Sequence, residues 1–132
     1  MENNTSYLEQ ILSVLKDKHK EMDKLMTLTK ELEKVMETGD PESFGAVLGM
    51  REVSMETIDR HNEEVRKILD NLEDNSREKI KMILGPELPE NISFRECTIE
   101  SGIFETNKMT LSILRKIIAL DDKINIRIKK GV

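Results

Sequence analysis

Apolar residues recur every seven positions along two long stretches of this 132-residue chain. In the first stretch the repeat extends to residue 36, and it is interrupted only by Lys18 and Thr29. The seven-residue positions of the two stretches are Leu8, Leu15, Met22 and Met36, and then Phe44, Ile58, Val65 and Leu72. This spacing is typical of helices that pack as a supercoiled antiparallel bundle. Because six Gly and three Pro are too few for a chain rich in turns, we expect an all-α protein.

The first break in the pattern is the sequence Thr38-Gly39-Asp40-Pro41. Glycine can take the left-handed conformation that follows a helix end. Asp40 can cap the next helix, and Pro41 suits its first position, where no backbone amide is needed. A connection this short predicts an antiparallel helical hairpin.

The breaks predict one domain over residues 1–132, with helices at about 6–37, 41–84 and 94–130 and a loop at 85–93. Ser6 and Ser93 each begin a Ser-x-x-Glu capping box, which marks the start of the first and third helices. The second helix could be interrupted near residues 74–76. The predicted fold is an elongated three-helix bundle, built on a long antiparallel hairpin with a C-terminal third helix.

Composition excludes several classes of function. The net charge is −5, and no concentrated basic stripe is present, which argues against nucleic acid as the main ligand. The N-terminus lacks the pattern of a signal peptide, and no apolar run is long enough to span a membrane. The single cysteine, Cys97, excludes a disulfide framework. We therefore expect a soluble cytoplasmic protein with a reduced thiol.

Neither catalysis nor cofactor binding is predicted. His19 and Asp23, and likewise His61 and Glu64, share a helix face, but neither histidine has a glutamate three residues before it, as a di-iron bundle requires. The chain has no glycine-bracketed serine, phosphate-binding loop or dinucleotide fingerprint. We expect a protein without metal, cofactor or enzymatic activity.

The third predicted helix carries two apolar stripes. Its expected core stripe comprises Ile103, Thr106, Thr110, Ile113, Ile117, Leu120, Ile124 and Ile128. A second stripe, on a face expected to point away from the first two helices, comprises Phe104, Leu111, Leu114, Ile118 and Ile126. An exposed apolar face requires cover, so this stripe is the predicted partner-binding site. A homodimer contact and additional core are the alternatives.

Residues 36–59 bear the strongest family resemblance. In "GDPESFGAVLGMREVSMETID" a helical hairpin turns at Gly-Asp, and a basic residue follows about a dozen positions later. This pattern resembles the FlgN-type flagellar export chaperones, on the residues Gly39, Asp40, Glu42, Leu48, Arg51 and Ile58. A weaker likeness lies in "IIALDDKINIRI" (117–128), where Asp121 departs from the family's Leu-Asn pattern and Asn125 matches its later Asn.

The resemblance implies a cytoplasmic chaperone that binds the C-terminal helices of flagellar hook-associated proteins at the hook–filament junction and delivers them to the type III export apparatus. In that family the C-terminal helix region binds the substrate. The alternatives are a coiled-coil homodimer, another helical interaction module, or the related FliT-like chaperones of the filament cap. Arg51 lies where the repeat requires an apolar residue. We interpret it as a side chain that extends to the edge of the seam, although the resemblance implies a basic residue paired with an acid on the first or third helix.

Overall fold

The structure is a computed structural model that describes residues 2–85 and 98–129, with side chains from residue 4 onward. It contains the helices α1 (Glu2–Thr38), α2 (Pro41–Leu69), α3 (Asp74–Ile83) and α4 (Ile99–Lys129), and the described residues contain no strand. The all-α prediction is thus confirmed, but four helices replace the three expected.

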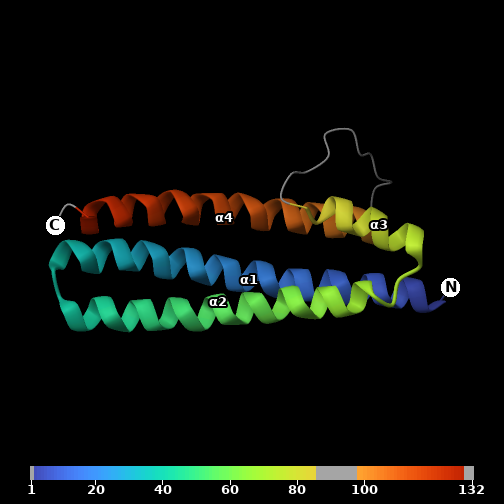
Figure 1. Cartoon of the computed structure of the whole chain (residues 1–132), viewed down its shortest axis with the longest axis horizontal. Helices are drawn as coiled ribbons and strands as arrows, with labels where there is room; N and C mark the ends of the chain where they lie inside the picture. The colour runs from blue at the N-terminus through green and yellow to red at the C-terminus, as the bar shows by residue number, and fades with distance from the viewer. Residues whose placement is uncertain (1, 86–97, 130–132) are drawn as a thin grey trace.

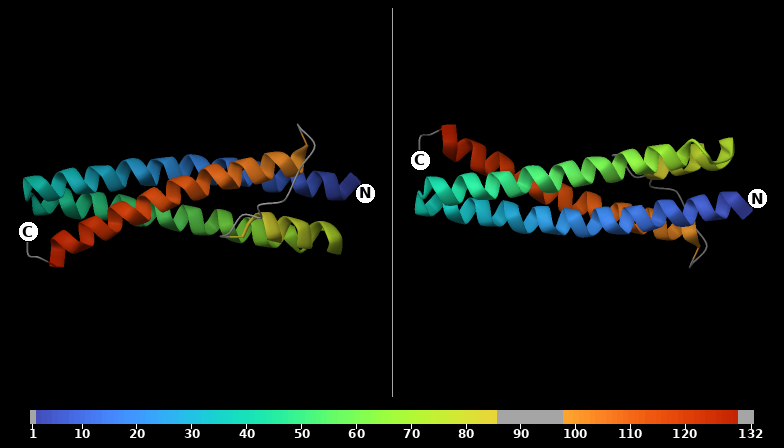
Figure 2. Two further views of the ribbon diagram at one scale, coloured as in Figure 1. Left: turned by 90° about the horizontal axis from the view of Figure 1, so that it is seen from above. Right: turned by 90° about the horizontal axis from the view of Figure 1, so that it is seen from below.

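The helices form an elongated bundle in which α1 lies between α2 and α4 (Figure 1). The helix α3 lies beside the N-terminal half of α4, near the end of the bundle that holds the start of α1. Two further views show that α4 crosses the α1–α2 hairpin obliquely (Figure 2). Within the described chain, α1 packs along both α2 and α4, whereas the backbones of α2 and α4 do not pack closely together.

The hairpin turn has the predicted chemistry. Gly39 has a φ of +73°, which is the left-handed conformation expected after a helix end. The Asp40 carboxylate accepts hydrogen bonds from the Ser43 hydroxyl at 2.6 Å and from the Glu42 amide at 3.2 Å, and Pro41 is the first residue of α2. These two hydrogen bonds hold the pKa of Asp40 below its ordinary value, and the bond from the Ser43 hydroxyl contributes the most.

The predicted start of the first helix is wrong. The helix α1 begins at Glu2 rather than Ser6, and the Ser6 hydroxyl accepts a hydrogen bond from the Gln10 side chain inside the helix. The additional turn has tertiary contacts, because the Asn4 side chain accepts a hydrogen bond from the Glu73 amide and donates one to Ser76. These contacts tie the beginning of α1 to the α2–α3 connection.

The third predicted helix, in contrast, starts later than expected. Here α4 begins at Ile99, and Thr98 precedes it as a cap whose hydroxyl accepts a hydrogen bond from the Ser101 amide. The capping box at Ser93 and the thiol of Cys97 lie outside the described residues.

The second predicted helix is broken, a few residues before the expected position. The helix α2 ends at Leu69, and α3 begins at Asp74. Arg77 stabilises the break by donating hydrogen bonds to the carbonyl oxygens of Leu69 at 3.1 Å and Leu72 at 2.8 Å, and to the Asp74 carboxylate at 3.1 Å. The guanidinium thus adds a second donor to the Leu69 carbonyl, which already accepts from the Leu72 amide, and supplies a donor to the Leu72 carbonyl at the helix end.

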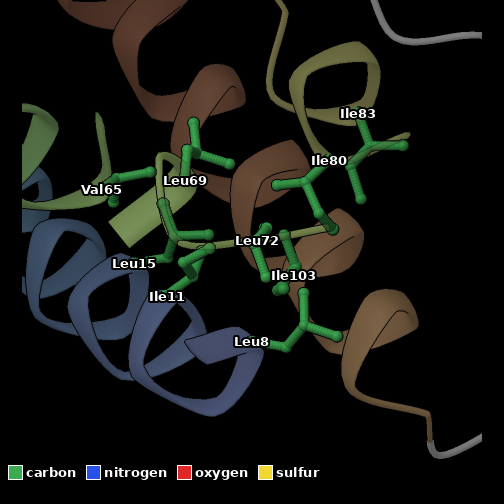
Figure 3. Packing of buried hydrophobic residues seen from close by; sticks show 9 residues of the cluster. All are labelled: Leu8, Ile11, Leu15, Val65, Leu69, Leu72, Ile80, Ile83 and Ile103. Carbon is green, nitrogen blue, oxygen red and sulfur yellow. The ribbon is translucent and has the colours of Figure 1, made fainter. Parts of the chain in front are cut away.

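The core consists of three clusters of buried residues along the bundle axis. The largest, which we call the four-helix cluster, draws on α1, α2, α3, α4 and the α2–α3 connection (Figure 3). It comprises Leu8, Ile11, Leu15, Val65, Leu69, Leu72, Ile80, Ile83 and Ile103. The middle cluster comprises Met22, Leu25, Ile58 and Ile117, and the tip cluster comprises Leu32, Val47 and Ile124. Both smaller clusters contain residues of α1, α2 and α4 only.

Candidate protein-binding groove

An open groove runs between α2 and α4 beside the middle cluster. Its floor is formed by Lys18, Met22 and Leu25 of α1, and its volume is about 370 Å³. One wall contains Met55 and Ile58 of α2. The opposite wall contains Leu114, Ile117 and Ile118 of α4. We call this feature the α2–α4 groove.

The groove is open because α1 separates the two helices that form its walls. Each wall has a residue that remains accessible to solvent: Met55 on α2 is 42% exposed, and Ile118 on α4 is 51% exposed. Apolar side chains on both walls and on the floor make it a site where an apolar ligand can displace water.

An ion pair joins the two walls. The Nη2 atom of Arg51 on α2 donates to both carboxylate oxygens of Asp121 on α4, at 2.9 and 2.8 Å. The Arg51 side chain is only 10% exposed, so the interpretation that it extends to the edge of the seam is wrong. The pairing that the family resemblance implied, with an acid on the third predicted helix, is present.

Lys18 introduces a charge into the floor of the groove. The position interrupts the apolar repeat of α1, and its side chain is partly buried. Burial lowers the pKa of its ammonium group, because desolvation disfavours the charged form. Within the described part of the chain Lys18 forms no ion pair.

The predicted binding stripe is divided by the structure. Leu114 and Ile118 line the groove, whereas Phe104 is half-buried against the four-helix cluster. Leu111 is half-buried, and Ile126 is 53% exposed outside the residues that line the groove. Leu114 also packs against the middle cluster, so the expectation that the whole stripe points away from the first two helices is wrong.

The sequence alone assigned Met22, Ile58 and Ile117 of the groove to apolar core positions. Apolar periodicity identifies residues that face a neighbouring helix, but it does not show whether a third helix closes over them. The interruption of the repeat at Lys18 is the signal that marks this segment, because a fully covered seam seldom contains an unpaired lysine.

A second cavity of about 250 Å³ lies at the hairpin tip, and its lining includes Met36, Phe44 and Ile128. The described residues contain no group of three or more histidine, cysteine or carboxylate side chains placed to hold a metal ion. His19 lies 3.8 Å from Asp23, as its spacing predicted, without a third ligand.

None of the helices in the described parts of the chain combines the length and apolar content needed to cross a membrane. No protein-family model matches the sequence, and comparisons with curated proteins and with solved structures find no match either.

Proposed function

We propose that the protein is a cytoplasmic flagellar type III export chaperone. It binds the C-terminal helical region of hook-associated proteins of the hook–filament junction, prevents their premature assembly and delivers them to the export apparatus. The observation that supports the proposal most directly is the apolar α2–α4 groove, which offers an amphipathic helix a floor on α1 and two walls on α2 and α4. The resemblance of residues 36–59 to FlgN-type chaperones supplies the identity of the partner.

The groove suits capture of a helix by apolar contact. A partner helix that presents apolar residues at i, i+3 or i+4, and i+7 would place them between Met55 and Ile118, above Met22 and Leu25. Burial of a few hundred Å² at roughly 25 cal/mol per Å² contributes several kcal/mol before the cost of association is subtracted. Such moderate affinity fits a chaperone that must release its substrate.

Isothermal titration calorimetry tests this proposal. The titrants are synthetic peptides that carry the C-terminal helical segments of the hook–filament junction proteins from the same organism. We expect binding by the native chain, and loss of binding in Met55→Glu and in the double variant Leu111→Asp/Ile118→Asp. Met50→Glu is the matched control, because Met50 is 55% exposed on the same helix and does not line the groove.

Several results would contradict the proposal or favour an alternative. If none of the junction peptides binds, the assignment of the partner is wrong, and selective binding of a filament-cap peptide would favour the FliT-like alternative. If Met50→Glu and Met55→Glu weaken binding equally, the binding site is not the α2–α4 groove. A concentration-dependent dimer that Met55→Glu dissociates would favour the alternative of a helical homodimer.

A further inference from the structure

The floor of the α2–α4 groove combines an apolar surface with one cation that forms no ion pair with the residues the structure describes. Lys18 lies in the floor together with Met22 and Leu25. A partly desolvated ammonium group without a carboxylate destabilises the free protein, since burial weakens its hydration and nothing in the described chain replaces it. Its neighbours show why the chain itself does not supply that carboxylate.

Three acidic groups near this segment form no ion pair with Lys18. Asp121 is held by Arg51 through both carboxylate oxygens. Glu21, one turn from Lys18 on α1, accepts a hydrogen bond from the buried hydroxyl of Ser54 at 2.7 Å. Asp59 lines the groove but is exposed and forms no ion pair with Lys18. The lysine is therefore available to an acid that enters from outside.

We propose that the α2–α4 groove selects an amphipathic helix that carries an aspartate or glutamate within its apolar face, and that this carboxylate binds the ammonium group of Lys18. The inference deepens the proposed function and rests on the groove as the site of helix binding. The apolar residues of the bound helix contact Met55 and Ile118, and they exclude water from the ion pair. A charge-assisted contact in such a setting is stronger than the same contact at an open surface.

The selection distinguishes among apolar helices. Any amphipathic helix can bury apolar area, but a helix that places a lysine or a leucine over Lys18 leaves the ammonium group repelled or desolvated without a partner. The cost of an unpaired buried charge then falls on the incorrect ligand, which is a general route to specificity. The affinity of the groove for a helix thus depends on the charge of the helix as well as on its apolar pattern.

The test uses the full chain and a matched pair of designed helical peptides. Both peptides have the same leucine-based amphipathic sequence, and they differ only in a central Glu or Gln within the apolar face. Titration calorimetry is performed with the native chain, with Lys18→Met and with Lys16→Met, in which an exposed lysine of the same helix is replaced. Circular dichroism verifies that the variants are folded.

We expect the native chain and Lys16→Met to bind the Glu peptide about tenfold more tightly than the Gln peptide, which corresponds to about 1.4 kcal/mol. In Lys18→Met this preference disappears. Equal affinity of the native chain for the two peptides, an undiminished preference in Lys18→Met, or no binding of either peptide would overturn the inference. Failure of the junction peptides alone would refute the proposed function and leave the Glu–Gln comparison to decide the inference.

Discussion

The two halves of the bundle differ in how completely they are enclosed. At one end, α3 packs beside α4, and the four-helix cluster contains nine buried apolar residues. Along the other half the described residues form three helices, the clusters contain four and three buried residues, and the seam includes buried Thr29, Arg51 and Ser54. The same seven-residue pattern runs through both halves, so the difference arises from the fourth helix.

Under the proposed function, this difference divides the bundle into an end that stabilises the fold and a half that binds the partner. The enclosed end holds the chain together mainly through its apolar cluster, whereas the other half keeps an open groove and a buried ion pair. A helical bundle without α3 would need to close the α2–α4 groove in order to bury enough apolar surface.

Isoleucine truncations in the two halves of α4 provide the strongest test of this separation. Ile103 is fully buried in the four-helix cluster, and Ile117 is nearly as buried beside the groove. We expect Ile103→Ala to lower the free energy of unfolding by about 4 kcal/mol, and Ile117→Ala by about 2 kcal/mol, because the open groove allows side chains to relax into the space. Urea unfolding followed by circular dichroism measures both values. Equal losses would show that the two halves are enclosed alike.

Substitutions in the α2–α3 connection should have the next largest effect on the free energy of unfolding, because this connection positions α3. Replacement of Arg77 by Met removes its hydrogen bonds to the Leu69 and Leu72 carbonyls. We expect a loss of about 2 kcal/mol, since each bond has a charged donor. Arg66→Met is the control: Arg66 is exposed and paired only with Glu63, and we expect a change within about 0.5 kcal/mol. If the two substitutions cost the same, Arg77 does not stabilise the break.

Sequence reasoning predicted the parts of the fold that depend on local chemistry. The all-α class and the hairpin turn at Gly39 and Asp40 follow from composition, left-handed glycine and helix capping, and the structure confirms them. The possible interruption of the second helix was also recognised, although its position was a few residues too late.

Tertiary contacts determined the rest. The start of α1 depends on Asn4 bonding to residues about seventy positions away, and the end of α3 depends on buried Asn107, whose amide donates to the Ile83 carbonyl. No short motif contains either pairing. The groove was missed for a related reason: periodicity placed Leu114 and Ile118 on one stripe, but only the oblique path of α4 sets them opposite Met55.

The smallest predicted effect is a gain in stability and not a loss: replacement of Lys18 should raise the melting temperature. This prediction tests whether the charge in the groove floor destabilises the fold. Burial lowers the pKa of Lys18 in the folded state below its ordinary value of 10.5, so the unfolded chain binds the proton more readily. Charged Lys18 therefore destabilises the fold at neutral pH, and this penalty is lost as the pH rises through the folded pKa towards and above 10.5, where both states are neutral.

We accordingly expect Lys18→Met to raise the melting temperature at neutral pH, with a gain that shrinks as the pH rises towards 10.5. The part of this increase in melting temperature that comes from the apolar character of methionine does not depend on pH. The part that changes with pH therefore measures the destabilising effect of the charge on Lys18. Lys16→Met, at an exposed position, should change the melting temperature little at any pH. A gain for Lys18→Met that stays constant with pH would show that the lysine carries no electrostatic penalty. If the gain shrinks as expected, the open half of the bundle carries an electrostatic cost beside its groove, whereas the enclosed half is stabilised by a nine-residue apolar cluster.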